Sequence, residues 1–135
     1  MRLVRVAGIM QVREARVLKH YGLSPVGHDI LTVLRDAGGS LPARRVADAI
    51  STASPDLTRL LQRLAAKELI GRERDTRDKR VMLVSLTDAG RDLLQQVAGP
   101  IGSLHKQMMG RLKKGERKEL VRILAALEEV NATRL

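Results

Sequence analysis

The sequence predicts a mainly α-helical fold with one small β-hairpin, an α+β arrangement. Apolar residues recur at helical spacing along most of the 135 residues, as the leucines of residues 57–64 do. The spacing falls to about two only over residues 69–74 and 81–86, as expected for two paired strands. The chain has one Tyr and no Phe or Trp, so its core must be aliphatic, which suits helix-on-helix packing.

The composition narrows the possible functions. The formal net charge of +10 favours an anionic partner, which could be nucleic acid, an acidic protein or a membrane surface. The absence of Cys excludes a disulfide scaffold, a thiolate metal site and a thiol redox switch. No apolar stretch approaches the length of a membrane span, and the N-terminal one contains Arg5 and lacks a signal-cleavage pattern. We therefore expect a cytoplasmic protein.

The first two helices have clear boundaries. A helix over about 3–20 should end at Tyr21-Gly22, because Gly tolerates the left-handed conformation of a helix stop. Ser24-Pro25 should open the second helix, with Ser as the N-cap and Pro at the first helical position. Gly38-Gly39 should close it. Its predicted inward stripe is Val26, Ile30, Val33 and Leu34.

A short third helix and an amphipathic fourth helix follow. The third is expected over about 42–50, and Ser54-Pro55 repeats the cap-and-proline start before the fourth. In the third helix the residues predicted to be buried are Val46, Ala47 and Ile50. In the fourth, the leucines face inward and the opposite face carries Asp56, Arg59, Gln62, Arg63 and Lys67.

The hairpin has a charged turn over residues 75–79, and Thr87 should cap the helix that follows it. Pro100 lies inside this long fifth helix and is expected to kink it. A sixth helix is predicted over about 115–131. The fifth helix has a coiled-coil-like seam of Leu93, Val97, Ile101, Leu104, Met108 and Leu112. The inward face of the sixth is Leu120, Ile123, Leu124, Leu127 and Val130.

A short helix, a turn, a helix with a polar outer face and then a charged hairpin form a winged helix-turn-helix. The major groove of B-DNA admits one helix, whose N-terminal polar side chains read the DNA. A flanking hairpin can place an Arg in the minor groove, and Asp78 would hold Arg80 in position. Arg44 and Arg45 are candidates for phosphate contact, because cations are mildly unfavourable at a helix start. The predicted DNA-binding residues are Ser54, Asp56, Thr58, Arg59, Gln62, Arg63, Arg74, Arg77, Asp78, Arg80, Arg44 and Arg45.

Two motifs make the chain similar to the MarR (multiple antibiotic resistance regulator) family. Asp78-Lys79-Arg80 matches the family's D-x-R at the hairpin tip, and residues 86–90 (LTDAG) match its L-T-x-x-G. The resemblance implies a homodimer on a pseudo-palindromic operator. Residues 1–22 and 91–135 would form the dimerisation helices, and residues 23–90 the DNA-binding domain.

The resemblance also implies roles for individual parts of the chain. Each fourth helix would enter the major groove, with Arg80 in the minor groove and Asp78 as its support. A small-molecule effector, if there is one, would bind in the cleft between the first, second and fifth helices. The polar candidates near that cleft are Arg13, Arg16, His20, Tyr21 and His28.

We therefore predict a DNA-binding transcriptional regulator, most simply a repressor that occupies a promoter. The alternative from another class is a basic helical adaptor that binds an acidic protein through the same fold. An enzyme is not expected, since there is no Cys, no glycine-rich phosphate loop and no carboxylate pair in an apolar setting. The three His residues lack metal-ligand spacing, so neither a metal nor a cofactor is predicted.

Overall fold

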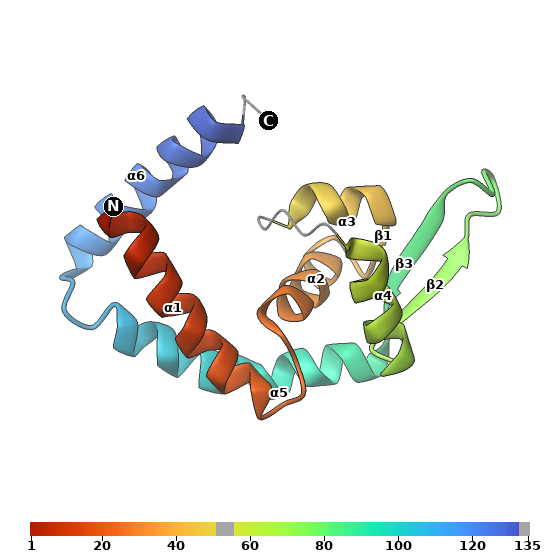
Figure 1. Ribbon diagram of the computed structural model, residues 1–135, viewed down its shortest axis with the longest axis horizontal. Coiled ribbons are helices and arrows are strands. Elements are labelled where there is room, and N and C mark those ends of the chain that lie inside the picture. The colour runs from red at the N-terminus through yellow and green to blue at the C-terminus, as the bar shows by residue number, and fades with distance from the viewer. Residues whose placement is uncertain (51–55, 133–135) are drawn as a thin grey trace. The chain divides into compact units, whose positions relative to one another are not determined.

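The computed structural model describes residues 1–50 and 56–132 and confirms the predicted order of helices and hairpin (Figure 1). Residues 1–101 form one compact unit and residues 102–135 another. In the described part, no helix is long and apolar enough to cross a membrane. The elements are α1 (Arg2–Lys19), α2 (Pro25–Asp36), β1 (Ser40–Pro42), α3 (Ala43–Ala49), α4 (Leu57–Ala66), β2 (Ile70–Arg74), β3 (Met82–Leu86), α5 (Asp88–Met108) and α6 (Lys114–Ala132).

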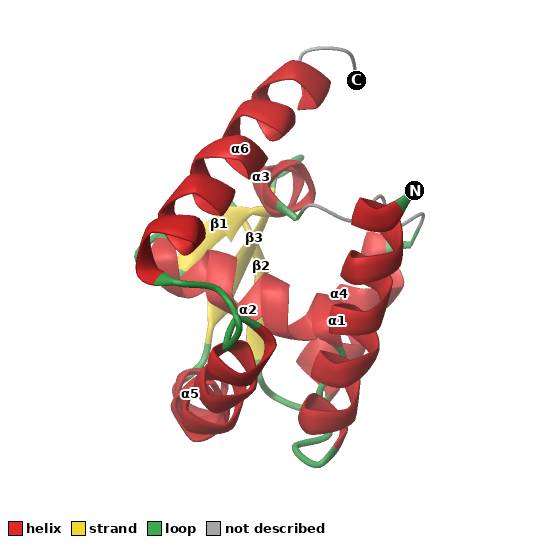
Figure 2. Ribbon diagram, turned by 90° about the vertical axis from the view of Figure 1, so that its left-hand side faces the viewer, coloured by secondary structure: helices red, strands yellow, loops and turns green. Residues whose placement is uncertain are grey.

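The strands form one antiparallel sheet in the order β1-β3-β2 (Figure 2). The predicted hairpin is confirmed as β2 and β3, with Arg72 opposite Val84. Strand β1 was not predicted. Its three residues are too few to show an alternating pattern, and their pairing with β3, as in Leu41 opposite Val84, makes them a strand. Pro42 ends the strand, and α3 begins one residue later than the predicted start.

The buried face of α2 packs against α1, α3 and β3. The capping prediction is confirmed, because the Ser24 hydroxyl accepts a hydrogen bond from the Gly27 amide at 3.0 Å and Pro25 is the first helical residue. The predicted stripe was partly wrong, since Val26 and Val33 are only half-buried. The fully buried face is Gly27, Ile30, Leu31 and Leu34.

Gly27 explains why the predicted buried stripe of α2 was partly wrong. A Cβ on Gly27 would lie 3.1 Å from Leu23 Cδ1 and 3.5 Å from Leu64 Cδ2. The position is therefore a close-contact point of the core that a count of apolar side chains overlooks. Gly38 and Gly39 end α2 with φ values of 88° and 106°, which confirms the predicted stop.

Helices α3 and α4 bury one face each. In α3, Val46 is buried and Ile50 directly follows the helix as a buried residue, but Ala47 is exposed, contrary to prediction. A helix of seven residues has only about two turns, so it presents a narrow buried stripe. In α4 the predicted leucine face is confirmed, with Leu61 and Leu64 buried.

The start of α4 differs from the prediction. The Asp56 carboxylate accepts a hydrogen bond from the Arg59 amide at 3.1 Å, so Asp56 is the N-cap and the helix begins at Leu57. The predicted cap, Ser54, lies outside the described residues. Ser and Asp cap helices about equally well, so an Asp two positions after the predicted cap can open the helix.

The two C-terminal helices begin close to the predicted positions, but α5 ends before its predicted seam does and not all of the predicted burial is confirmed. Of the predicted seam, Val97, Ile101 and Leu104 are buried, Leu93 and Met108 are half-buried, and Leu112 lies beyond the helix end. Leu94, which was not predicted, is also buried. Pro100 lies within α5, as predicted. Helix α6 has no buried residue among those described, so the prediction that its apolar face points inward is wrong for a single chain. Its exposed apolar residues are Val121, Ile123, Leu127 and Val130.

Candidate nucleic-acid interface

The outer face of α4 is polar and exposed, opposite its leucines. Asp56 has two contacts with Arg59: its Oδ1 accepts from the Arg59 amide, and its Oδ2 lies 3.1 Å from the Arg59 Nε. The residue that caps the helix therefore also restrains a cation in its first turn. The predicted DNA-binding residues of this face are all exposed: Asp56, Thr58, Arg59, Gln62 and Arg63.

The wing, defined as β2, β3 and the turn between them, extends away from the helices (Figure 1). Backbone bonds close its turn: the Asp75 amide donates to the Val81 carbonyl at 2.9 Å, and the Val81 amide to the Asp78 carbonyl at 3.0 Å. The Asp75 carboxylate also accepts from the Arg77 amide at 3.1 Å. These bonds give the tip a defined shape.

Asp78 and Arg80 form the pair that the sequence predicted. The Arg80 amide and Nε donate to Asp78 Oδ1 at 3.0 and 3.1 Å, and Nη2 donates to Oδ2 at 3.2 Å. These hydrogen bonds from Arg80 lower the pKa of the Asp78 carboxyl, so the carboxylate stays charged beside the guanidinium. The Arg80 side chain is nevertheless 91% exposed. An ion pair thus orients a cation that remains open to solvent.

A groove of about 510 Å³ separates the start of α3 from the tip of the wing. It brings Arg44 and Arg45 to the same surface as Arg80, from segments more than 30 residues apart in the sequence. Strand β1 makes this juxtaposition possible, because its pairing with β3 fixes the α3 start beside the wing. No local sequence signal predicts β1, so the proximity of these arginines to Arg80 could not be predicted from the sequence.

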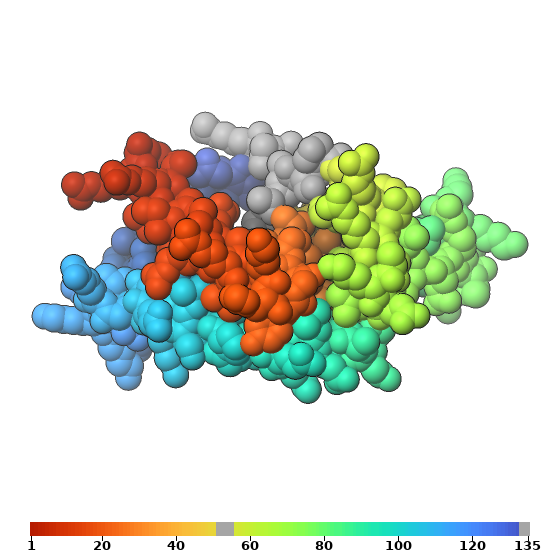
Figure 3. All heavy atoms as spheres, turned by 60° about the horizontal axis from the view of Figure 1, so that its bottom comes forward, coloured from red at the N-terminus to blue at the C-terminus, as the bar shows by residue number. Residues whose placement is uncertain are grey.

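The polar face of α4 and the wing lie on neighbouring surfaces of the protein. In the space-filling view, the surface of α4 and the protruding wing stand side by side (Figure 3). Arg74 and Arg77 of the wing are exposed as well. All the predicted DNA-binding residues that the structure describes therefore present polar or charged groups to solvent, with Asp78 half-buried. Ser54 lies outside the described residues.

Thr87 joins the wing, α4 and α5. Its hydroxyl donates to the Glu68 carbonyl at 2.7 Å and accepts from the Gly90 amide at 3.0 Å, while its own amide donates to the Leu69 carbonyl at 3.2 Å. The predicted N-cap is confirmed. Gly90 is required for a different reason: a Cβ there would lie 2.2 Å from the Leu69 oxygen. The motif at residues 86–90 therefore fastens the end of α4 to the start of α5.

The residues predicted to lie near an effector occupy different surroundings. Arg13 and Arg16 line one open depression on α1, whereas Tyr21 packs against the core. His20 is exposed just after α1, and His28 is half-buried in α2. Among the described residues, no three His, Asp or Glu side chains are grouped as metal ligands.

Comparisons with known proteins agree with this geometry. A family model described as transcriptional regulator SarA/Rot matches residues 15–97. A solved structure of a MarR transcription factor from Planctomyces limnophilus is 31% identical, with a TM-score of 0.72, over 92% of this chain and 90% of that one. The HTH-type transcriptional regulator YwaE of Bacillus subtilis is 28% identical over 90% of this chain and 71% of its own length.

A third relative shares the fold at lower identity. The MarR family regulator Sco3205 from Streptomyces coelicolor, solved in complex with DNA, is 23% identical, with a TM-score of 0.88, over 95% of this chain and 82% of that one. The family match covers more than half of the chain and favours the predicted regulator over the adaptor or an enzyme. The chain is a DNA-binding winged helix-turn-helix transcriptional regulator of the MarR/SarA family.

Proposed function

We propose that this chain is a repressor that binds a pseudo-palindromic operator as a homodimer, with α4 in the major groove and the wing in the minor groove. The observation that carries the proposal is that the exposed α4 face lies beside the wing, whose Arg80 shares a groove with Arg44 and Arg45. Sco3205, a protein of the same fold that was solved in complex with DNA, supports DNA binding by this fold.

In the major groove, the exposed first turns of α4 meet the base edges. Arg59 is the prime reader there, because Asp56 restrains its guanidinium before DNA arrives. Thr58, Gln62 and Arg63 complete the face, and Ser54, also a predicted DNA contact, lies outside the described residues. Arginine is suited to this task because its guanidinium can make two parallel bonds to guanine.

In the minor groove, Arg80 is the inserted cation and Asp78 its support. Ordering a long side chain on binding costs about 0.5–1.5 kcal/mol, and the two bonds from the Arg80 guanidinium to Asp78 offset part of that cost in the free protein. Arg74 and Arg77 flank it on the wing. Arg44 and Arg45 contact the phosphates between the two grooves, where the cavity at the start of α3 admits the backbone.

The proposal of a dimer is supported by apolar side chains that are exposed to solvent in a single chain. On α1, Val4, Ile9 and Val12 are exposed by 68, 52 and 54%. Helix α6 has its own exposed apolar face, and large exposed apolar patches mark association surfaces. Residues 1–22 and 91–135 are accordingly the dimerisation segments, and residues 23–90 the DNA-binding domain. A two-fold dimer reads a pseudo-palindrome.

A dimer bound to a promoter excludes RNA polymerase and so represses transcription. The protein acts in the cytoplasm, where transcription takes place. An effector in the cleft of α1, α2 and α5, near Arg13, Arg16, His20, Tyr21 and His28, would change the spacing of the two α4 helices. That spacing must match successive major grooves.

A binding assay with designed variants tests the proposal. An operator is first selected from random duplexes, and fluorescence anisotropy then measures affinity as a function of salt. Arg80→Ala should weaken binding by about 1–3 kcal/mol. Arg35→Ala is the matched control, because Arg35 also pairs with a neighbouring Asp but lies at the end of α2. Unchanged affinity in Arg80→Ala would refute the minor-groove role, and failure to bind any duplex at low salt would refute the proposal.

Asp78→Ala distinguishes a carboxylate that positions Arg80 from one that only repels the phosphates of DNA. If Asp78 orders Arg80, its removal weakens operator binding despite the loss of a negative charge near phosphate. If it only repels DNA, its removal strengthens binding. Size-exclusion chromatography with light scattering tests the dimer, which Val4→Lys should convert to monomer.

A further inference from the structure

The connection between α5 and α6 carries a concentrated positive charge. Residues 106–118 contain six Lys and Arg residues and one Glu, so this segment alone holds half of the chain's formal net charge of +10. It spans the end of α5 and the first turn of α6, within the compact unit of residues 102–135. We call residues 106–118 the basic turn. Its cations, all of them exposed, are Lys106, Arg111, Lys113, Lys114, Arg117 and Lys118.

The nearby carboxylates do not neutralise these cations. Glu116 Oε2 accepts a hydrogen bond from the Lys113 backbone amide at 2.6 Å, a bond typical of a helix start. Glu119 is paired with Arg122, whose Nε donates to its Oε2 at 3.0 Å, and this hydrogen bonding lowers the pKa of the Glu119 carboxyl. Among the residues that the structure describes, none of the six cations forms an ion pair.

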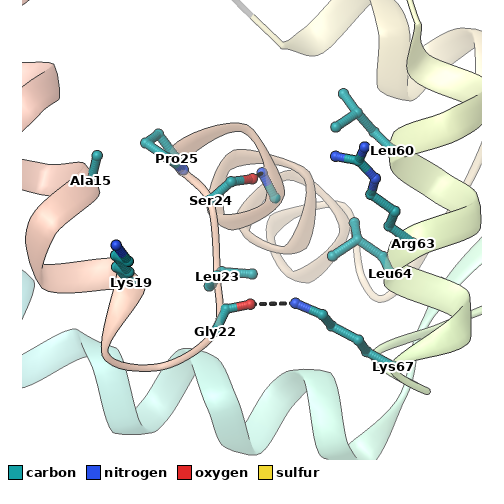
Figure 4. Close-up of a pocket in the computed structure, with 11 residues that line it drawn as sticks. Ala15, Lys19, Gly22, Leu23, Ser24, Pro25, Leu60, Arg63, Leu64 and Lys67 are labelled. Atoms are coloured by element: carbon teal, nitrogen blue, oxygen red, sulfur yellow. Dashed lines mark hydrogen bonds between the residues drawn. The ribbon is translucent and has the colours of Figure 1, made fainter.

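Hydrogen bonds hold the basic turn in one shape. The Leu112 amide donates to the Met109 carbonyl, and Arg117 Nε donates to the Leu112 carbonyl, both at 3.0 Å. Arg117 thus has a structural contact, as does Lys67 on the other compact unit, whose Nζ donates to the Gly22 carbonyl (Figure 4). Within the described part of the chain, the lysines of the basic turn whose side chains have no such contact are Lys106, Lys113, Lys114 and Lys118.

This arrangement of charge is unfavourable in the free protein. Lys113 and Arg117 are four residues apart, as are Lys114 and Lys118, and like charges at that spacing repel each other on a helix. Lys114 and Arg117 also lie in the first turn of α6, where the helix dipole disfavours cations. A bound polyanion would relieve both effects.

The chemistry of the basic turn favours phosphate over protein as its partner. Protein interfaces are centred on aromatic and apolar side chains and are depleted in Lys. The basic turn has four lysines and no aromatic residue, and its larger apolar side chains, those of Met108, Met109 and Leu112, are half-buried. Duplex DNA presents closely spaced phosphates that Lys and Arg neutralise without reading the sequence. For a member of a DNA-binding family, duplex DNA is therefore the polyanion that fits best.

We propose that the basic turn is a second DNA-binding surface, which contacts duplex phosphates without regard to sequence and in addition to the contacts of α4 and the wing. This surface goes beyond the proposed operator recognition and does not depend on it. The exposed apolar residues of α6 that are proposed for the dimer begin at Val121, so the two roles use different residues.

Fluorescence anisotropy of the full chain tests the surface, with the selected operator and an unrelated duplex of equal length, over a range of salt concentrations. The test variant combines Lys113→Gln, Lys114→Gln and Lys118→Gln. If each lysine contacts a phosphate, the log–log slope of affinity against salt should fall by about two to three, since each contact contributes about 0.9. Affinity at low salt should fall at least about tenfold for both duplexes, which leaves the preference for the operator unchanged.

Two matched controls separate local charge from structure and from net charge. The first replaces the same three lysines with Arg, which keeps the charge and should preserve binding. The second combines Lys19→Gln, Arg35→Gln and Arg91→Gln, which remove the same charge from exposed sites on α1, α2 and α5 and should leave the salt slope unchanged. Thermal unfolding is a further readout: the test variant should melt at a higher temperature than the wild type at low salt only, because salt screens the repulsion.

An unchanged salt slope in the test variant, or a loss of slope that the second control shares, would overturn the proposal. Lower stability, or an altered mass by light scattering, would do so as well, because the lysines would then serve the fold or the dimer. If the test variant loses binding to labelled poly-L-glutamate but keeps duplex binding, the partner is an acidic protein and the proposal is wrong. If the wild type binds both duplexes equally, the operator proposal fails while the salt slopes still test the basic turn.

Discussion

Gly90→Ala is the substitution that most directly tests how the wing and α4 are held to α5. The added Cβ would lie 2.2 Å from the Leu69 carbonyl oxygen and 2.7 Å from Leu86 Cδ1. Real side-chain carbons essentially never approach closer than 3.0 Å, and the first of these neighbours is backbone. The start of α5 must therefore move away from Leu69.

That movement has a predictable energy. It weakens the bonds from the Thr87 amide to Leu69 and from the Thr87 hydroxyl to Glu68, each contributing about 1 kcal/mol. Residual overpacking adds about 1–3 kcal/mol. The higher helix propensity of Ala returns about 1 kcal/mol. The free energy of unfolding should therefore fall by about 2–4 kcal/mol, which lowers the melting temperature by roughly 10 °C for a chain of this size.

Urea and thermal unfolding, followed by circular dichroism at equal protein concentration, measure the change. Gly115→Ala in the first turn of α6 is the control, because a Cβ there meets nothing within 4 Å. Its unfolding free energy should rise by up to about 1 kcal/mol, the helix-propensity gain of Ala, rather than fall. If Gly90→Ala unfolds like the control, the close approach of Leu69 does not constrain this position and the reasoning is refuted.

Two further substitutions test buried polar groups in α2 by the same unfolding measurements. The Thr32 hydroxyl is buried without a hydrogen-bond partner, so Thr32→Val should stabilise the fold by about 1 kcal/mol, and a loss of stability would show that the hydroxyl is satisfied after all. Burial raises the pKa of the Asp29 carboxyl above its ordinary 3.8, with Glu14 adding to the rise and His28 opposing it. Such a group destabilises the fold as pH rises through that raised pKa. Asp29→Asn should therefore be more stable than wild type near neutral pH and lose this advantage below pH 3.8; an advantage independent of pH would contradict this explanation.

The sequence predicted the fold well where local chemistry decides it. Ser24-Pro25, Gly38-Gly39 and Thr87 act through bonds or backbone conformations within a few residues of themselves, and the structure confirms each one. The Asp78–Arg80 pair is local in the same sense, since the two residues are separated by one position in a tight turn. Its predicted geometry was correct for that reason.

Predictions failed where residues distant in sequence decide the structure. Strand β1 forms only because β3 pairs with it, and no local signal marks Ser40–Pro42 as a strand. The position of Gly27 in the core depends on Leu64, which is 37 residues away. The groove that joins Arg44 and Arg45 to Arg80 depends on β1. The predicted arginines were therefore proposed as separate contacts, although the structure places them on one surface.

Three consecutive residues just after α4 tie this helix to both of its neighbouring helices. Lys67 holds the turn after α1 through the Gly22 carbonyl. Glu68, with a φ of 59°, and Leu69 then offer their carbonyls to Thr87 at the start of α5. The proposed reader helix is thus anchored to both neighbouring helices through one short segment. Lys67→Gln removes the first of these anchors, and Gly90→Ala strains the second. If the orientation of α4 depends on both, either change should weaken operator binding while the Asp78–Arg80 pair in the wing remains intact.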